Sequence, residues 1–484
     1  MKKIFDRIIS LMLCIFTIIG IVACSNAVTD SSSNIDNSHI HTLEYTAGKA
    51  PSCKQIGFLE YWYCTDCKEY FADEACTKSI SMDELWLEKT SHKLTRYERV
   101  EPTETQEGNI EYWQCNDCKE YFVDEDGTVK ISQEQTLVVS PYKLCDFIVE
   151  VEESRDIVVL QLSDPQIIDA AQKRSANRLT AEAEAYWATD KIEERCYGYM
   201  RETIQATNPD FIFITGDLIY GEFDDKGTSW LSLIAFMESF CIPWAPIFGN
   251  HDNESAKGVE WQCEQLENAE YCLFKKGEVN GNGNYTVGIM QGGKLKRAFV
   301  MLDTHGCLRN AGLAQDQVQW FTEEVTKINN STQDCKISFA MHIQPIIFKD
   351  AYAKYGFTNS GTSSNPINID TVENAAESDF GYIGANLKNP WDADYRIWDT
   401  IKGLGIDSIF VGHEHANSAS VVYQGVRFQF GQKSSTYDRA NYVTEDGKIV
   451  CSYSEAGDPL VGGSVFSISK NTGDIVNAYI YLCA

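Results

Sequence analysis

Five short apolar runs in the second part of the chain each end at a polar side chain. The runs are Asp156–Ser163, Asp210–Gly216, Pro243–Gly249, Lys336–Met341 and Asp407–Gly412. Continuous hydrophobic runs of this length predict strands that are buried on both faces. The residues that follow them are Asp164, Asp217, Asn250 with His251 and Asp252, His342, and His413 with His415. Ligands bind beyond the carboxyl ends of strands in open α/β sheets, so the pattern predicts a site built from these residues.

The N-terminal apolar run has a different character. It extends from Ile8 to Val22 behind Lys2, Lys3 and Arg7, and it is short for a hydrocarbon core of about 30 Å. A basic start, a short apolar run and a small residue before the cut predict a secretory signal over residues 1–23. The ending Ile21-Val22-Ala23-Cys24 resembles a bacterial lipobox, which implies lipidation of Cys24 and a membrane anchor on the extracellular face. The alternative is a simple secretory signal followed by an incidental cysteine.

Two copies of a cysteine-containing segment follow, after a Ser- and Asn-rich stretch over residues 24–38 that predicts a flexible tether. The copies occupy residues 39–90 and 91–142 and repeat at an offset of 51 residues. His41 recurs as His92, and the Cys64/Cys67 pair recurs as Cys115/Cys118. A copy of about 50 residues buries only a small hydrophobic core, so each copy is expected to need an additional stabilising cross-link.

A structural zinc ion is one candidate for that cross-link. The Cys-x2-Cys spacing is typical of a zinc knuckle, because a tight turn directs both thiolates at one ion. In the first copy, His41 and Cys53 are expected to complete a tetrahedron with Cys64 and Cys67; the second copy has Glu104 in place of Cys53. A Cys-x2-Cys redox pair and reduced thiols packed as small hydrophobes are the alternatives. The copies are similar to short repeats of bacterial surface proteins, which implies that they act as spacers or contact the cell wall.

The net charge of the chain disfavours some classes of binding partner. The chain of 484 residues carries 70 acidic and 41 basic side chains, a formal net charge of −29. Such a surface repels nucleic acids and anionic lipids, so no nucleic-acid partner is expected. A composition of 43% hydrophobic and 23% charged residues excludes a disordered chain.

The strand-end residues resemble the motifs of the calcineurin-like metallophosphoesterase superfamily. The matching segments are Asp164-Pro165-Gln166, Gly216-Asp217, Gly249-Asn250-His251-Asp252, His342 and Gly412-His413-Glu414-His415. They occur in the family's order within residues 145–484, and Asn282-Gly283-Asn284-Tyr285 resembles the purple acid phosphatase-like branch. The resemblance implies a four-layer α/β/β/α sandwich, here preceded by two small β-rich cysteine repeats.

The same resemblance implies a dinuclear metal site that hydrolyses a phosphoester substrate with a metal-activated water. Asp217 matches the residue that bridges the two ions. Asp164, Gln166 and His415 would serve the first metal, and Asn250, His342 and His413 the second. His251 would contact the phosphate and protonate the leaving oxygen, with Asn250 beside it. The ions would be Mn, Fe or Zn, either divalent or of mixed valence.

Two positions depart from the common pattern. Gln166 replaces the usual histidine, and an amide oxygen is a weaker and harder ligand than imidazole. Tyr220 fits a Gly-Asp-x-x-Tyr pattern whose tyrosine binds ferric iron; the alternative is a tyrosine that packs the loop wall. The leading hypothesis is a lipid-anchored extracellular phosphoesterase. The alternatives are a catalytically weakened surface or binding protein on the same fold, and thiol redox chemistry through the two Cys-x2-Cys pairs.

Overall fold

The computed structural model describes residues 40–172, 181–187, 192–305, 312–332, 334–356, 366–384 and 396–484. The predicted signal peptide, Cys24 and the tether lie outside the described residues, and so does part of the segment between the fourth and fifth motifs. Among the described helices, none combines the length and hydropathy that a bilayer span requires. The chain folds as two compact units: the described residues up to Thr95 with Cys115–Glu120, and Arg96–Gln114 with Tyr121–Ala484.

The N-terminal β-rich region contains two four-stranded sheets with the same antiparallel order. The first is β1 (Leu43–Thr46), β3 (Tyr61–Cys64), β4 (Tyr70–Phe71) and β5 (Ser79–Ile80). The second is β7 (Leu94–Tyr97), β9 (Tyr112–Cys115), β10 (Tyr121–Phe122) and β11 (Lys130–Ile131). Short pairs join β2 (Gly57–Phe58) to β6 (Trp86–Leu87) and β8 (Gly108–Asn109) to β12 (Leu137–Val138), and α2 spans Met82–Leu85.

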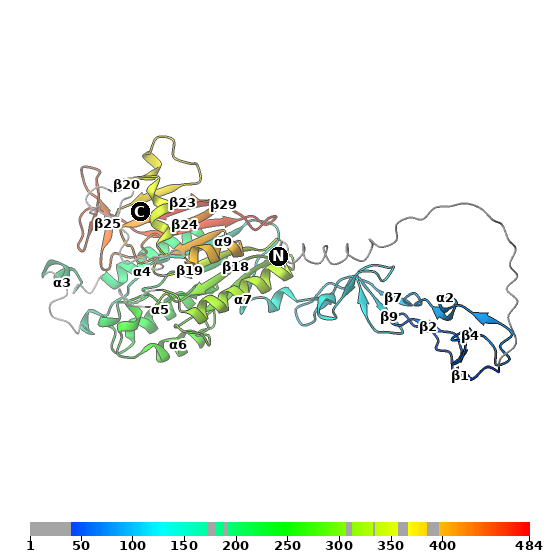
Figure 1. Ribbon diagram of the computed structural model, residues 1–484. Helices are drawn as coiled ribbons and strands as arrows, with labels where there is room; N and C mark the ends of the chain where they lie inside the picture. Colours follow the sequence, from blue (N-terminus) through cyan, green and yellow to red (C-terminus); the bar gives the residue numbers. More distant parts are fainter. Residues whose placement is uncertain are drawn as a thin grey trace. The chain divides into compact units, whose positions relative to one another are not determined.

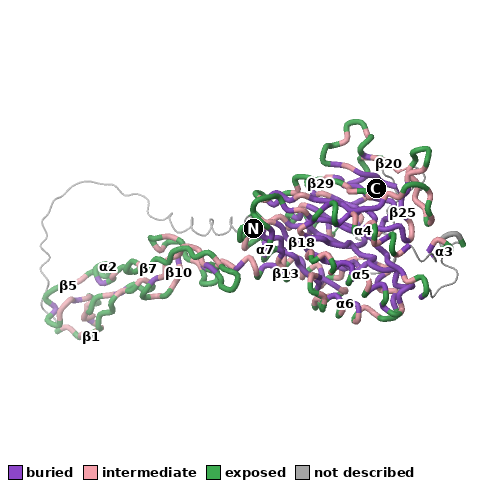
Figure 2. Tube along the Cα trace, turned by 180° about the vertical axis from the view of Figure 1, so that it is seen from behind, coloured by how far each residue is buried: buried purple, intermediate pink, exposed green. Residues whose placement is uncertain are grey.

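These repeats bury few side chains. The core of the first consists of Cys64, Phe71 and Cys76, with Leu43 and Trp62 packed partly against it. Figure 2 shows mostly exposed and intermediate residues along this region, in contrast to the buried interior of the larger part of the chain. A core of this size gives little hydrophobic stabilisation, which agrees with the expectation that the repeats need another source of stability.

The larger unit contains two mixed sheets (Figure 1). The order of the nine-stranded sheet is β13 (Phe147–Glu150), β17 (Tyr285–Gln291), β18 (Lys294–Leu302), β19 (Lys336–Met341), β22 (Ser408–Val411), β24 (Val426–Phe430), β23 (Asn417–Tyr423), β21 (Phe380–Ile383) and β20 (Ile367–Asn368). The order of the five-stranded sheet is β16 (Trp244–Pro246), β15 (Phe211–Ile214), β14 (Ile157–Leu162), β28 (Gly462–Ile468) and β29 (Ile475–Leu482). A small sheet adds β25 (Ala440–Val443), β26 (Ile449–Ser452) and β27 (Asp458–Leu460).

Helices cover the outer faces of both sheets. The helices are α3 (Ala181–Trp187), α4 (Ile192–Thr207), α5 (Thr228–Glu238), α6 (Val259–Glu267), α7 (Gln315–Ser331), α8 (Ile347–Ala353) and α9 (Arg396–Leu404). One core joins both sheets to α4, α5 and α6, and another joins the nine-stranded sheet to α7, α8 and α9. Along β18, Phe299 belongs to the first core and Val300 to the second. This alternation confirms the predicted four-layer α/β/β/α sandwich with β-rich segments before it.

All five predicted runs form strands, and they are divided between the two sheets. β14, β15 and β16 are parallel neighbours in the five-stranded sheet, and β19 and β22 are parallel neighbours in the nine-stranded sheet. Phe213 on β15 contacts Phe299 and Phe410 of the facing sheet, so the sheets pack directly against each other. The turns after the five strands therefore meet at one edge of the sandwich.

Candidate metal centre

The turns that carry the candidate ligands have an unusual backbone. Asp164, Asp217 and His413 adopt φ values of 50°, 49° and 69°, in the left-handed region that non-glycine residues rarely enter. Such conformations cost roughly 1–3 kcal/mol each and persist where the surrounding structure holds them. At each of these three positions the backbone turns sharply at the end of a strand, so that the side chain faces the other candidate ligands.

Two motif glycines permit the close approach of these turns. A Cβ on Gly249 would lie 2.2 Å from the backbone nitrogen and Oδ1 of Asp217, and one on Gly412 would lie 2.5 Å from the carbonyl oxygen of Thr215. Both distances are too short for any side chain. The Asp252 carboxylate then ties the Asn250 turn to the Asp217 turn, because it accepts from the backbone nitrogens of Gly249 at 2.7 Å and Ile219 at 2.9 Å.

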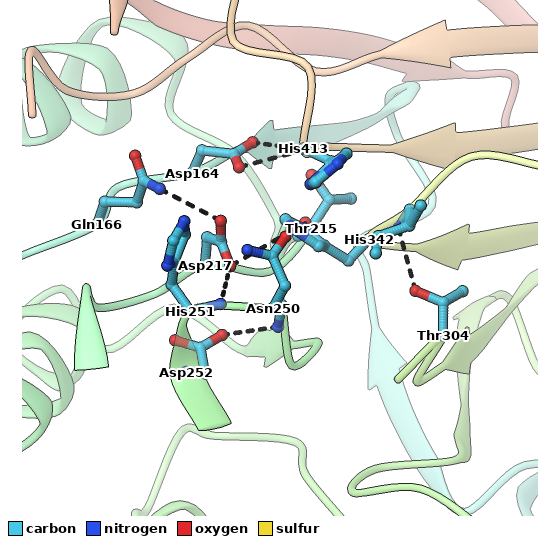
Figure 3. Close-up of polar contacts among 12 residues, drawn as sticks. Asp164, Gln166, Thr215, Asp217, Asn250, His251, Asp252, Thr304, His342 and His413 are labelled. Carbon is cyan, nitrogen blue, oxygen red and sulfur yellow. Dashed lines mark hydrogen bonds and ion pairs between the residues drawn. The ribbon is translucent and has the colours of Figure 1, made fainter. Parts of the chain in front are cut away.

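The centre itself is a buried group of carboxylates and imidazoles (Figure 3). Ligand atoms of Asp164, Asp217 and His342 lie within 4.8 Å of one another. Nε2 of His342 is 3.4 Å from Oδ1 of Asp217 and 3.1 Å from Oδ1 of Asn250. Its Nδ1 donates to the carbonyl oxygen of Thr215 at 2.7 Å, which orients the ring with Nε2 toward the centre.

The two histidines of the last motif lie on the Asp164 side. The backbone nitrogen of His413 donates to both carboxylate oxygens of Asp164, at 3.2 and 3.1 Å, and its ring centroid lies 5.2 Å from that of His342. His415 places Nε2 3.3 Å from Oδ1 of Asp164 and Nδ1 3.2 Å from Oδ2 of Asp438. The structure thus brings the predicted ligands of both metals into one cluster.

The electrostatics of the cluster suit bound cations. Burial would raise the pKa of Asp217, but His342 and His251 outweigh it and hold this pKa below its ordinary value. Burial, with His342 beside it, lowers the pKa of His413 to about 3. The ionised form of Asp217 and the neutral form of His413 are the forms that bind metals. Burial acts to lower the pKa of His342, but Asp217 and Asp164 outweigh it and raise this pKa to about 10, so a metal on Nε2 would displace a proton. Asp164 and Asp217 also repel each other in a buried site, which a cation relieves, and an O/N donor set suits Mn, Fe or Zn.

Gln166 makes contacts that its predicted role as a ligand did not include. Its Oε1 accepts from Nζ of Lys433 at 2.8 Å, and its Nε2 donates to Oδ2 of Asp217 at 3.2 Å. Since an ammonium group only donates, Lys433 fixes which end of the amide faces Asp217. Lys433 also donates to the carbonyl oxygen of Asp164 at 2.8 Å. In this arrangement Gln166 orients the Asp217 carboxylate, and its role as a metal ligand stays a prediction.

We expect Lys433→Met to lower kcat/KM or metal affinity by about 10- to 100-fold, the usual effect of removing an outer partner of a metal site. Lys433 is 1% exposed, and its loss frees the Gln166 amide and removes a positive charge beside both aspartates. Kinetics and metal analysis of the purified variant measure the effect. Lys402→Met on α9 serves as the matched control, and equal behaviour of the two variants would contradict the role assigned to Lys433.

His251 has the contacts that a proton donor needs. Its backbone nitrogen donates to Oδ1 of Asp217 at 2.8 Å, and Nδ1 lies 2.9 Å from Oε2 of Glu254. Burial acts to lower the pKa of His251, but the carboxylates of Asp217 and Glu254 outweigh it and raise this pKa above the ordinary value. A protonated imidazole is therefore favoured near neutral pH, as protonation of a leaving oxygen requires.

The pH profile of Glu254→Gln tests this interpretation. Glu254 raises the pKa of His251, so its neutral replacement lowers that pKa, and the acid form is then lost at a lower pH. We expect the alkaline limb of the kcat/KM profile to move to lower pH while the acidic limb is little changed. An unchanged alkaline limb would show that His251 is not the acid that this limb reports.

Tyr220 packs against His251. The two rings are stacked, with centroids 4.0 Å apart and an interplanar angle of 24°, and Tyr220 also contacts Trp187 and Phe223 at its edge. This stacking favours the interpretation that Tyr220 packs the loop wall and positions His251. The role of Tyr220 as an iron ligand stays a prediction.

Optical spectroscopy distinguishes the two roles of Tyr220. We expect the metal-loaded protein to be colourless, and Tyr220→Phe to keep its metal content and most of its activity, because the phenyl ring still stacks on His251. A visible charge-transfer band that disappears in Tyr220→Phe would instead show a tyrosinate ligand.

Three residues of the centre were not found from the sequence. Lys433 lies three residues after β24, so the rule that polar residues follow buried strands could have found it. Glu254 lies three residues after His251, so its i,i+3 spacing was a local signal that could have found it. Asp438 carries no comparable signal, because it approaches His415 through the path of a loop.

The zinc ligands predicted for the first repeat need a correction. The structure groups His41 with Cys64 and Cys67, but it places Cys53 with His92, Cys115 and Cys118. The expectation followed sequence order within one repeat. The loop that carries Cys53 instead approaches the second repeat, where Nζ of Lys54 lies 3.1 Å from Oε1 of Glu120.

The four-layer fold and the buried Asp, Asn and His cluster at the strand ends define a protein of the metallophosphoesterase type. The sequence over residues 157–417 matches the calcineurin-like phosphoesterase family. The match covers more than half of the chain, and the chain belongs to this family.

Individual relatives are distant. The chain is 23% identical over 241 residues to phosphatase DCR2 of Saccharomyces cerevisiae, covering 47% of this chain and 39% of that protein. It is 27% identical over 184 residues to an uncharacterized protein of Schizosaccharomyces pombe, covering 36% and 34%. It is 41% identical over 58 residues to probable inactive purple acid phosphatase 28 of Arabidopsis thaliana, covering 12% and 15%. The chain thus spans between a third and two fifths of the length of the two fungal relatives.

Among solved structures, the chain is similar to a dimetal phosphatase from Danio rerio, with a TM-score of 0.37 and 10% sequence identity. The match covers 65% of this chain and 93% of the phosphatase chain.

Proposed function

We propose that this protein hydrolyses phosphoesters outside the cell, at a dinuclear metal site, while a lipid on Cys24 holds it at the membrane. The observation that carries the catalytic part is the position of Asp217. Its Oδ1 accepts from the backbone nitrogen of His251 and lies near His342, whereas its Oδ2 accepts from Gln166. A carboxylate whose two oxygens face opposite sides of a buried cluster suits the bridging role that the resemblance implied.

Different residues of the site would bind the cations and protonate the leaving group of a phosphoester substrate. Asp164, Asp217 and His415 would hold one cation, and Asp217, Asn250, His342 and His413 the other. When bound, such a pair of cations neutralises charge on the phosphate and lowers the pKa of the attacking water. His251, held by Glu254 and stacked on Tyr220, protonates the leaving oxygen.

Metal removal tests the catalytic proposal. We expect the purified protein to contain two ions and to hydrolyse an aryl phosphate monoester or diester. Chelation should remove activity, and Mn, Fe or Zn should restore it. Full activity in the chelated, metal-free protein would contradict the proposal, and comparison of monoesters with diesters gives the substrate class.

A catalytically weakened binding protein is the second candidate. It is favoured by Gln166 in the place of the usual histidine, with its oxygen engaged by Lys433, and by similarity to a relative named as probably inactive. Two bound ions without turnover of either ester class would support this candidate instead.

The anchor and the repeats need separate tests. Cys24→Ala should release the protein from the membrane fraction and abolish labelling by a fatty-acid probe, whereas the unchanged protein keeps both. Contact of the repeats with the cell wall, proposed from the resemblance, predicts that residues 39–142 are required for co-sedimentation of the whole protein with purified wall. Equal co-sedimentation without them would contradict it.

A further inference from the structure

Four potential zinc ligands from both repeats meet at one point. Cys53 comes from the first repeat, and His92, Cys115 and Cys118 come from the second; their ligand atoms all lie within 4.8 Å of one another. Cys115 is fully buried. All four residues belong to the same compact unit, because the Cys115–Glu120 turn folds with the residues up to Thr95.

The spacing of these atoms fits a tetrahedral ion. Sγ of Cys53 lies 3.9 Å from Sγ of Cys115, and Sγ of Cys118 lies 3.5 Å from Nδ1 of His92. Bond lengths of about 2.3 Å to sulfur and about 2.0–2.1 Å to nitrogen separate two sulfurs by about 3.8 Å, and sulfur from nitrogen by about 3.6 Å. The sulfur atoms of Cys53 and Cys115 are too far apart to be bonded to each other.

Neighbouring contacts hold the Cys53 loop against the second repeat. Nζ of Lys54 lies 3.1 Å from Oε1 of Glu120 in the second repeat. Within the first repeat, the Ser52 carbonyl accepts from the backbone nitrogen of Thr90, two residues before His92. Within the Cys-x2-Cys turn, Lys119 donates to the Cys115 carbonyl and Cys115 to the Glu120 carbonyl. Backbone contacts therefore fix the turn that carries Cys115 and Cys118, and the ion pair of Lys54 with Glu120 holds the Cys53 loop beside that turn.

We propose that Cys53, His92, Cys115 and Cys118 bind one Zn²⁺ ion and that this ion fastens the first repeat to the second. Each repeat has too small a core to dock firmly on its own, and a shared ion supplies the missing link between them.

This arrangement explains why the copies differ in their cysteines. The second Cys-x2-Cys site takes its fourth ligand from the loop of the preceding repeat, so the thiol at position 53 serves the second repeat. The second copy has Glu104 at the position equivalent to Cys53. Residues 143–484 contain no third repeat that would need a thiol from this loop. In the first copy Nδ1 of His41 lies 3.3 Å from Cys64 and 3.6 Å from Cys67, and no fourth His, Cys, Asp or Glu of the described residues joins them.

Cobalt binding to the whole protein under reducing conditions tests the proposal, because only thiolate ligands give the near-ultraviolet charge-transfer band. Two backgrounds separate the sites: Cys64→Ser with Cys67→Ser removes the first, and Cys115→Ser with Cys118→Ser removes the second. Cys53→Ala is then added to each background. Cys53→His supplies a replacement ligand, and Cys241→Ala, an exposed cysteine elsewhere, is the matched control.

In the first background, Cys53→Ala should weaken cobalt binding at least about tenfold and diminish the band, and Cys53→His should restore tight binding. In the second background, Cys53→Ala should change nothing. An effect of Cys53→Ala in the second background would assign Cys53 to the first repeat and overturn the proposal. No effect in either background would overturn it as well. Hydrolysis of an aryl phosphate by the same variants of the whole protein is measured alongside, so that failure of this proposal is distinguished from failure of the proposed function.

Discussion

Asp217→Asn should abolish phosphoester hydrolysis while the protein remains folded. Loss of an outer partner of a metal site costs up to about 100-fold, and we expect loss of the bridging carboxylate to cost more than that. Asparagine keeps the volume of the side chain but removes its charge and one of two acceptor oxygens. These oxygens accept from His251 and Gln166, and one lies beside His342.

The measurement compares kcat/KM on an aryl phosphate, bound metal and the far-ultraviolet circular dichroism of the variant with those of the unchanged protein. Asp399→Asn on the exposed side of α9 is the matched control and should behave like the unchanged protein. Retained activity with a native spectrum would refute the bridging assignment. The metal content then shows whether the loss of activity follows the loss of an ion.

Arg297→Met should produce a large loss of stability without a direct effect on the site. Arg297 is fully buried on β18, and its guanidinium donates to both carboxylate oxygens of Asp407, at 2.6 and 2.8 Å. It also donates to the carbonyl oxygen of Gly473, in the turn between β28 and β29. One side chain therefore links the two sheets at the end of β18 opposite to the site.

Removing one member of a buried ion pair costs about 3–5 kcal/mol, because the other member loses its partner. The Asp407 side chain is 29% exposed and regains some water, so we expect about 3 kcal/mol. Denaturant unfolding of the whole protein measures the loss of stability. Arg155→Met is the control and should cost clearly less, because Arg155 is half-exposed and Asp210 still accepts from the backbone nitrogen of Val158 after its loss. Similar losses in the two variants would contradict the structural role of Arg297, and Arg297→Met with Asp407→Asn should recover part of the loss.

The sequence by itself determined the strands, the order of the ligands and the family. Buried parallel strands must be apolar throughout, so the runs ending at Asp164, Asp217 and His342 could be read directly. The rule that ligands follow such strands then selected the candidate residues. These signals are local: each depends on a few neighbouring residues and on the chemistry of their side chains.

Tertiary structure alone decided which of these residues share a partner. The five strands are divided between two sheets, and only the packing of those sheets brings Asp164 to His415 and Asp217 to His342. The Gln166–Lys433 contact joins residues 267 positions apart, and the Cys53 loop turns toward the second repeat rather than its own. No local pattern specifies such contacts, because their positions follow from how loops and layers pack together.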